Sequence, residues 1–220
     1  MAYDRSIEGI IAPPAETLEQ WEDIRQRLAD AHRLDPITGS HAMVRMVLAQ
    51  RQQRFLNMGA FSRVYALNER RVLKFCRDLP SLRIMARLGK QSRLFPKVDR
   101  VLVAQAVEGP TLYHAAVVER LQEGYPKWIA SVIDVYRGPY RVETPLFARC
   151  RLLEIRHRIL NGTIAVPHTE VAELAKAMRL LAEECANENC LADLRTEQNV
   201  MLRHGRRAVI VDPTYPVDLD

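Results

Sequence analysis

Hydrophobic residues near the start of the chain recur at the spacing of an α-helix. Over residues 17–34 they fall on one side at steps of three and four. Asp35-Pro36 and Gly39 interrupt this pattern, and Ser40 can cap a second helix that follows. We therefore expect residues 1–54 to form a helical extension. The apolar faces of its two helices are Leu18, Trp21, Ile24, Leu28 and Ala31, and then Met43, Val44, Val47 and Leu48.

Shorter, strand-like patterns follow residue 54. They predict a hairpin around the polar turn 68–70, a short helix after Pro80 and then a buried strand. Glu108-Gly109-Pro110 ends that strand and predicts a stiff connector between two parts of the molecule. The small antiparallel sheet would thus span residues 55–107. The expected bounds are 62–67 and 71–76 for the hairpin, 81–88 for the helix and 101–107 for the strand.

Helical patterns dominate the rest of the chain, and a second hairpin comes near its end. The clearest helix begins at Thr169, and others are expected near residues 111–123, 126–136 and 145–160. Strands at 200–202 and 208–211 would be joined by a turn at His204-Gly205. The sequence therefore predicts an α+β fold in which residues 108–220 form a mostly helical second part.

Composition and charge narrow the class of protein. With 48% hydrophobic and 27% charged residues, the 220-residue chain can bury a core. Its first residues are acidic where a signal peptide needs basic charge, and no apolar run approaches the roughly 18 residues of a membrane span. We expect a soluble, cytoplasmic protein with no membrane partner. Four scattered cysteines favour reduced thiols over a zinc site, and the net charge of +5 suits an acidic protein, a nucleic acid or a nucleotide.

The first candidate for chemistry is the turn that precedes the hairpin. Residues 56–64, LNMGAFSRV, resemble the nucleotide-binding loop G-x-G-x-[FY]-[GS]-x-V, whose tip covers the phosphates. Gly59 keeps the middle glycine, Asn57 tolerates positive φ better than most residues, and Ser62 is small and can donate a hydrogen bond. With Val64, these residues are candidate ATP contacts, although a hairpin turn with one glycine is common.

Lys74 lies ten residues after Val64, between apolar neighbours in a strand. A lysine at this point of a nucleotide-binding sheet faces the α- and β-phosphates. A lone lysine in a strand is often only a solvated charge, so its meaning depends on the loop before it.

The strongest motif consists of three polar residues near the end of the chain. Asp193 and Asn199 belong to CLADLRTEQNVM, and Asp212, thirteen residues after Asn199, belongs to VIVDP. The hairpin between them would bring Asn199 and Asp212 side by side, where both could bind the Mg²⁺ or Mn²⁺ of a metal–ATP complex. Asp193 would orient an attacking hydroxyl, and Arg195 would contact the γ-phosphate. The alternative is that these acids only cap turns.

Five segments together resemble one family. NMGAFSRVY, RVLKF, FPKV, DLRTEQNVM and VIVDP are similar to motifs of the early serine/threonine protein kinase of podoviruses related to coliphage T-seven. The resemblance covers about residues 55–107 and 188–216. It implies a minimal two-lobed protein-kinase-like fold with a truncated C-lobe, and an ATP-dependent kinase that phosphorylates host proteins. The roles that it carries over belong to Lys74, Asp193, Asn199 and Asp212.

The chain departs from the family pattern in the catalytic loop. Asp193 and Asn199 are six residues apart instead of five, which we interpret as a bulge rather than as Gln198 in place of the asparagine. Leu191 and Ala192 stand where a histidine and an arginine usually support the loop. One support of this loop must therefore come from elsewhere.

A second departure concerns the partner of Lys74. Kinases of this kind place a glutamate in the following helix, whereas this chain offers Arg83 and Arg87 there. We expect Lys74 to be held differently, with Asp212 as its candidate partner. Only eight residues follow Asp212, so we expect substrate recognition to come from outside a usual activation segment.

Ligand placement and three alternative functions complete the prediction. The adenine is expected beside Gln105 and Glu108, and Thr214 or Ser62 is a candidate for self-phosphorylation. A small-molecule phosphotransferase would use the same acids. A pseudokinase-like docking protein would instead bind a host partner, with Trp21 and the N-terminal helices as its contact face. Nucleic-acid binding through the basic stretches 45–54 and 149–158 is less favoured, because such stretches are more often solvated helix faces.

Overall fold

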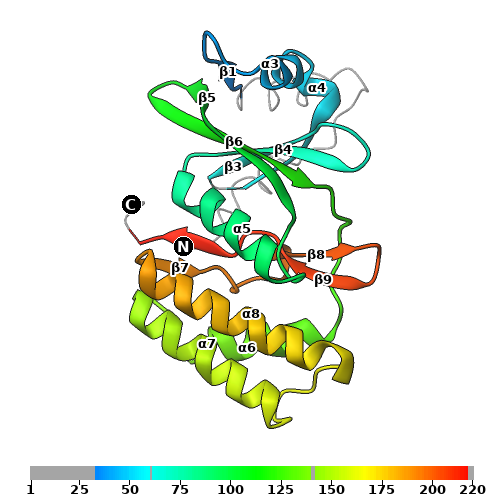
Figure 1. Cartoon of the computed structure of the whole chain (residues 1–220), viewed down its shortest axis with the longest axis vertical. Helices are drawn as coiled ribbons and strands as arrows, with labels where there is room; N and C mark the ends of the chain where they lie inside the picture. Colours follow the sequence, from blue (N-terminus) through cyan, green and yellow to red (C-terminus); the bar gives the residue numbers. More distant parts are fainter. Residues whose placement is uncertain (1–32, 60, 140–141, 218–220) are drawn as a thin grey trace, which may run out of the picture.

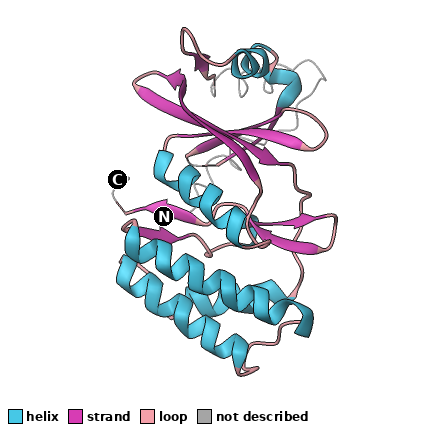
Figure 2. Cartoon of the chain, in the orientation of Figure 1, coloured by secondary structure: helices cyan, strands magenta, loops and turns pink. Residues whose placement is uncertain are grey.

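The computed structural model describes residues 33–59, 61–139 and 142–217. The helix expected over residues 17–34, with Trp21, lies outside this part except for its last two positions. Within it, the chain combines an antiparallel sheet with a group of helices, which agrees with the expected α+β class (Figure 1; Figure 2). We call residues 33–119 the sheet region and residues 120–217 the helical region.

Six strands form the main sheet in the order β1-β5-β6-β4-β3-β2, with every neighbouring pair antiparallel. The predicted hairpin is confirmed as β3 and β4, with Val64 opposite Lys74. The short β1 adds an unexpected edge strand beside β5. The bounds are β1 Asp35–Pro36, β2 Phe55–Met58, β3 Ser62–Ala66, β4 Arg71–Cys76, β5 Val98–Glu108 and β6 Thr111–Glu119.

Helices cover both faces of this sheet. On one face lie α3 (Ala42–Ala49) and the short α4 (Arg51–Arg54), and on the other lies α5 (Leu79–Gln91), as Figure 1 shows. The predicted apolar face of α3 is confirmed, because Val44, Val47 and Leu48 are buried against Tyr65, Leu73 and Phe75. The cap of α3 is His41 rather than Ser40, since the His41 side chain accepts a hydrogen bond from the Met43 amide.

The sheet extends further along the chain than expected. The connector predicted at residues 108–110 is wrong: Glu108 pairs with Thr111, and Gly109 has a φ of +54°, so this segment is a hairpin turn between β5 and β6. The helix predicted near 111–123 is also wrong, because residues 111–119 form β6. Its apolar residues lie on both faces of a central strand, a pattern that does not separate a buried strand from a helix. The sheet region therefore ends at Glu119 and not at Val107.

The helical region follows the prediction more closely. Its helices are α6 (Trp128–Arg137), α7 (Pro145–Leu160) and α8 (His168–Asn187), each within a few residues of its expected bounds. The late hairpin is confirmed as β8 (Val200–Arg203) and β9 (Arg207–Ile210). A further pair joins β7 (Cys190–Ala192) to β10 (Thr214–Pro216) beyond Asp212. The helices and these strands share one large core.

The C-terminal end of helix α5 fastens the sheet region to the helical region. Arg87 forms ion pairs with Glu184 and Glu188 near the end of α8. Just beyond the C-terminal end of α5, Glu173 of α8 accepts hydrogen bonds from the Ser92 hydroxyl (2.6 Å) and the Arg93 amide (2.9 Å). Arg87, which has the wrong sign to pair with Lys74, thus holds the helix in place.

Gly89 of α5 lies against the segment that follows the helix. A Cβ atom added there would meet the Pro96 carbonyl oxygen at 2.0 Å, so backbone must move to accept any side chain. We predict that Gly89→Ala destabilises the protein by roughly 1–3 kcal/mol, whereas the same change in an open helix stabilises by roughly 0.5–1 kcal/mol. Urea unfolding compares it with Lys90→Ala, a neighbouring exposed position. A gain in stability from Gly89→Ala would contradict the close contact.

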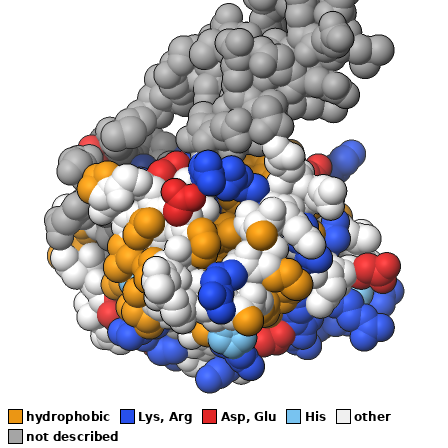
Figure 3. Space-filling model, turned by 90° about the horizontal axis from the view of Figure 1, so that it is seen from above, with side chains coloured by type: hydrophobic (Ala, Val, Ile, Leu, Met, Phe, Trp, Pro, Cys, Tyr) orange, Lys and Arg blue, Asp and Glu red, His pale blue; other side chains and the backbone are white. Residues whose placement is uncertain are grey.

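Seen from above, hydrophobic side chains are interspersed with Lys and Arg on the face in Figure 3. Among the described residues, no helix has both the length and the apolar character needed to cross a bilayer. All four cysteines are free, and Cys150 is the exposed one, which agrees with the expected reduced thiols.

Candidate functional site

The site begins with a row of residues that strand register places on one face of the sheet. Asn57 is opposite Val64, Val64 is opposite Lys74, and Lys74 is opposite Ala116. Directly opposite residues of neighbouring strands point to the same face. Three of the expected nucleotide-binding residues therefore share the face that α5 covers.

A tight turn closes the hairpin of β2 and β3. The Gly59 amide donates to the Ser62 carbonyl (3.0 Å), and the Ser62 amide donates to the Gly59 carbonyl (3.4 Å). Next to the turn, Asn57 accepts a hydrogen bond from the Met58 amide through its side chain (2.7 Å). The predicted loop thus has the expected strand-turn-strand form, with Ser62 on the same face as Lys74.

Lys74 joins the sheet region to the helical region through Asp212. The Lys74 Nζ lies 3.0 Å from the Asp212 Oδ1, and the lysine side chain is 10% exposed against 40% for the aspartate. Burial opposes the charge of Lys74, but Asp212, Cys76 and Asp193 together outweigh it, and the pKa of Lys74 lies above its ordinary value. The expected pairing of Lys74 with Asp212 is confirmed. Helix α5 contains no acidic residue that could compete for the lysine.

Asp193 and Asn199 meet across the loop that follows β7. The Asn199 side-chain amide donates to the Asp193 carbonyl oxygen (2.9 Å). The extra residue is absorbed in a 3₁₀ turn, Glu197–Asn199, and Gln198 is exposed. Asn199, and not the exposed Gln198, is therefore the residue whose side chain reaches Asp193.

Backbone hydrogen bonds bring Asp212 to the same place. The Val211 amide donates to the Asn199 carbonyl (2.9 Å), and the Asp193 amide donates to the Pro213 carbonyl (2.9 Å). These bonds flank Asp212 on both sides, while β10 pairs with β7 just beyond it. The four residues that the sequence singled out thus lie together where the two regions meet.

The surroundings of Asp193 raise the pKa of its carboxyl group. Burial and the neighbouring Asp212 carboxylate raise the pKa of Asp193 to about 6, against the opposing effects of Asn199, Arg195 and Lys74. A carboxylate with this pKa is ionised at neutral pH and is a better proton acceptor than an ordinary aspartate.

Arg195 lies near Asp193 but makes its own contacts. Its guanidinium donates to the Val142 carbonyl (2.6 Å) and stacks over the Tyr215 ring at 4.9 Å. A contact with a γ-phosphate, as the sequence suggested, would compete with the bond to Val142. In this structure Arg195 supports the loop rather than completing the row of site residues.

Gln105 and Glu108 do not belong to the site, so their predicted contact with adenine is wrong. Glu108 binds Arg63 (3.3 Å) and the Tyr113 hydroxyl (2.7 Å). Tyr113 packs in the core of the opposite sheet face. Gln105 faces β1 and accepts from the His41 amide. The error follows from the misplaced connector, because the strand that leads to the helical region is β6 and not β5.

The true connection starts at Glu119, at the end of β6. The Glu119 carboxylate is paired with Arg203 of β8, and both side chains are at most 10% exposed. Gln122, three residues on, exchanges two backbone hydrogen bonds with Leu202 (2.9 and 2.8 Å). The sequence gives no signal for this pair, because the partners are 84 residues apart.

Helix α6 supplies the loop support that the sequence left unassigned. The Tyr136 hydroxyl donates to the Ala192 carbonyl (2.8 Å), and the Arg137 Nε donates to the Arg195 carbonyl (2.5 Å). These contacts hold the loop on both sides of Asp193. Adjacent Tyr and Arg at the end of a predicted helix were the only available hint.

The donor set suits Mg²⁺ bound together with phosphates. The Asn199 nitrogen is engaged by Asp193, which leaves its Oδ1 for a cation, and Asp212 is half-exposed with a second carboxylate oxygen beyond the one that meets Lys74. Mg²⁺ often takes only one or two protein oxygens and completes its shell with phosphates and water. Among the described residues no group of three or more His, Cys, Asp or Glu forms a self-sufficient metal site.

The structure does not favour the two residues predicted as candidates for self-phosphorylation. The Thr214 and Ser62 side chains belong to residues that are 3% and 6% exposed, so neither hydroxyl is presented for self-phosphorylation.

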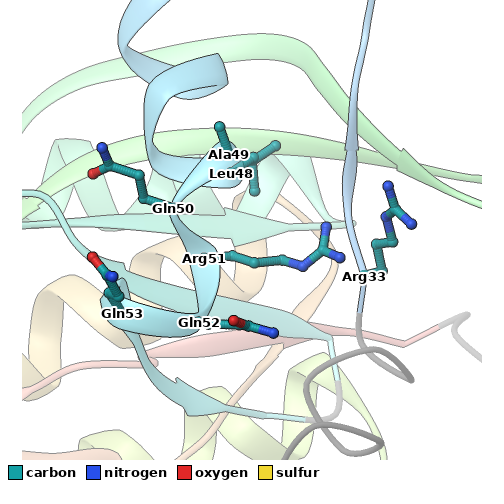
Figure 4. A pocket seen from close by; sticks show the side chains of 7 residues that line it. All are labelled: Arg33, Leu48, Ala49, Gln50, Arg51, Gln52 and Gln53. Atoms are coloured by element: carbon teal, nitrogen blue, oxygen red, sulfur yellow. The ribbon is translucent and has the colours of Figure 1, made fainter.

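A separate pocket of about 540 Å³, shown in Figure 4, lies at α4 and the end of α3. None of the expected site residues lines it; its lining is Arg33, Leu48, Ala49, Gln50, Arg51, Gln52 and Gln53.

Comparison with protein-family models, curated proteins and solved structures gives no significant match. The functional assignment therefore depends on the geometry of the site and on the sequence motifs that build it.

Proposed function

We propose that the chain is an ATP-dependent serine/threonine protein kinase with a minimal two-lobed kinase-like fold. The sheet region is its N-lobe and the helical region its C-lobe. The observation that carries the proposal is the meeting of Lys74 and Asp212 at 3.0 Å, beside Asp193 and Asn199. Four residues from β4 and from two loops far apart in sequence converge in the arrangement that phosphoryl transfer needs.

Each residue has a distinct task in this proposal. Lys74 neutralises charge on the α- and β-phosphates, and the hairpin tip at Gly59 closes over them. Asn199 and Asp212 would hold Mg²⁺, which would neutralise part of the charge on the phosphates. Val64, which is opposite Lys74 and only partly buried, offers an apolar side chain beside the lysine for the base of the nucleotide.

Asp193 handles the acceptor. Its carboxylate orients the serine or threonine hydroxyl and takes its proton as the oxygen attacks the γ-phosphorus. The bond between the γ-phosphorus and the oxygen that bridges it to ADP breaks, and ADP leaves with the electron pair of that bond. Positioning and electrostatic stabilisation provide most of the acceleration. By the family resemblance, we propose host proteins as the acceptors.

The test compares wild type with Asp212→Asn, which keeps the volume and removes the charge. We expect transfer of the γ-phosphoryl group from labelled Mg·ATP to proteins of a host lysate. Asp212→Asn should lower it by at least about a hundredfold through loss of the metal ligand and of the Lys74 partner. Asp134→Asn, an exposed acid on α6, is the matched control and should retain activity. Nucleotide binding without label on any protein would count against the proposal.

A second candidate is a nucleotide-binding docking protein without transferase activity. The absence of an acid in α5 favours it, because the helix offers no glutamate to pair with Lys74. Thermal-shift titration with Mg·ATP separates the two: binding with no transfer supports docking. Label on a small metabolite would instead indicate a small-molecule phosphotransferase.

A further inference from the structure

Helix α7 is apolar on two opposite sides. Toward the core it buries Ala148, Leu152, Ile155 and Ile159. Toward solvent it presents Leu146, Leu153 and Leu160, which are 66%, 38% and 51% exposed. Figure 1 shows α7 at the lower edge of the molecule, with α8 between it and the sheet. A helix that is apolar on both sides is normally covered on both.

The three exposed leucines form a straight row. Their spacing of seven residues corresponds to about two helical turns, so they lie on one line about 21 Å long. We call this line the leucine row. Its length and spacing match what a second helix needs to pack against α7.

The charges beside the leucine row are of one sign. Arg149 and Arg156, also seven residues apart, flank it on one side, and no ion pair with an acid is found for either among the described residues. The single acid of α7, Glu154, is already bound by Arg151 (3.1 Å) and Arg158 (2.6 Å). The face therefore combines an apolar line with two arginines that lack acidic partners.

We propose that the leucine row of α7 is a docking surface for an acidic amphipathic helix of a partner protein. Leucine-sized side chains of that helix would pack against Leu146, Leu153 and Leu160, and its glutamates or aspartates would pair with Arg149 and Arg156. An apolar line flanked by charges opposite to those of the partner determines which helix can pack against it.

Other occupants fit this face less well. A second copy of the chain would bring the arginines of two α7 helices toward each other. A lipid surface calls for a broad apolar face, whereas this row is one leucine wide. A nucleic acid would use the arginines but would leave the leucines in water. Charge complementarity therefore favours an acidic helix.

The surface is independent of the proposed kinase site. Strand β4, which carries Lys74, and β10, which follows Asp212, lie on the other side of α8 from α7 (Figure 1). A partner bound there would leave the nucleotide site open. Loss of docking and loss of nucleotide binding can therefore be measured separately.

The test uses the full chain and two synthetic helical peptides of about 20 residues, each with leucines at heptad spacing. One carries glutamates beside the leucines and the other carries lysines. Fluorescence anisotropy should show binding of the acidic peptide, at least tenfold tighter than of the basic one and weaker at higher ionic strength. The triple variant Leu146→Gln, Leu153→Gln, Leu160→Gln should weaken binding at least tenfold. Leu112→Gln, at an exposed leucine of β6, should not.

A charge reversal provides the sharper readout. Arg149→Glu with Arg156→Glu should invert the preference, so that the basic peptide binds more tightly. Equal binding of the two peptides, or binding that the triple variant leaves unchanged, would overturn the proposal. Self-association of the chain, or its binding to anionic vesicles, would also overturn the proposal if the triple variant abolishes it and the double arginine variant does not. The shift in melting temperature on addition of Mg·ATP should be the same for all variants. A variant that loses peptide binding but keeps this shift has lost the docking surface and not the nucleotide site.

Discussion

Asp193→Asn is expected to remove phosphoryl transfer and at the same time to make the protein more stable. Loss of a positioned proton acceptor lowers kcat by roughly 10²–10⁴-fold. The gain in stability has a separate cause: burial and Asp212 raise the pKa of Asp193 to about 6, so its ionised form is disfavoured in the folded protein. Asparagine keeps the shape and avoids the buried charge.

The pH dependence fixes the sign of this effect. A carboxyl group with a raised folded pKa contributes stability at low pH and loses it as pH rises from about 4 through about 6. The advantage of Asp193→Asn should therefore reach roughly 1 kcal/mol above pH 6 and disappear toward pH 4. Urea unfolding across this range measures it, with Glu69→Gln, an exposed acid in a turn, as the matched control. In wild type, kcat should fall as pH drops through about 6. A variant that is less stable than wild type at pH 7.5 would contradict this account.

Arg203→Met is expected to be the most damaging change outside the nucleotide site. Arg203 binds the Glu119 carboxylate, its Nε lying 3.0 Å from Oε2, and also donates to the Arg93 and Phe95 carbonyls. Methionine would leave the buried Glu119 charge and both carbonyls without the guanidinium. Removal of one partner from a buried ion pair costs about 3–5 kcal/mol.

A paired variant separates the value of the ion pair from the cost of breaking it. Glu119→Leu combined with Arg203→Met should recover much of the lost stability, because no buried charge remains. Thermal unfolding should show a fall of roughly 10 °C for Arg203→Met alone, given about 2–4 °C per kcal/mol for a protein of this size. The exposed Arg179→Met serves as control. A shift of under about 2 °C for the single variant would show that the pair is not a structural support.

The parts of the fold that the sequence predicted are those with a local signal. The periods of α7 and α8, the hairpin around residues 68–70 and the thirteen-residue interval between Asn199 and Asp212 each depend on near neighbours in the chain. The row from Val64 to Lys74 follows from the register of that hairpin. These features were predicted correctly because short-range geometry determines them.

The errors arise where tertiary contacts decide. Residues 111–119 form a central strand whose apolar side chains lie on both faces, so no alternation marks it as a strand. That error moved the connector to Glu108 and brought Gln105 into the expected site. The Glu119–Arg203 pair and the brace from Tyr136 join residues more than fifty positions apart, and local sequence patterns do not predict which distant residue each one contacts.

Helix α5 has one further consequence, which depends on the proposed kinase activity. Arg87 and the Ser92–Arg93 segment fix α5 to α8, and no side chain of α5 is needed to hold Lys74, which pairs with Asp212 instead. A swing of this helix could therefore neither assemble nor dismantle the site. Such an enzyme would be active from the moment it folds, and a cell that contains it would set its output through how much of the protein is made and how long it survives.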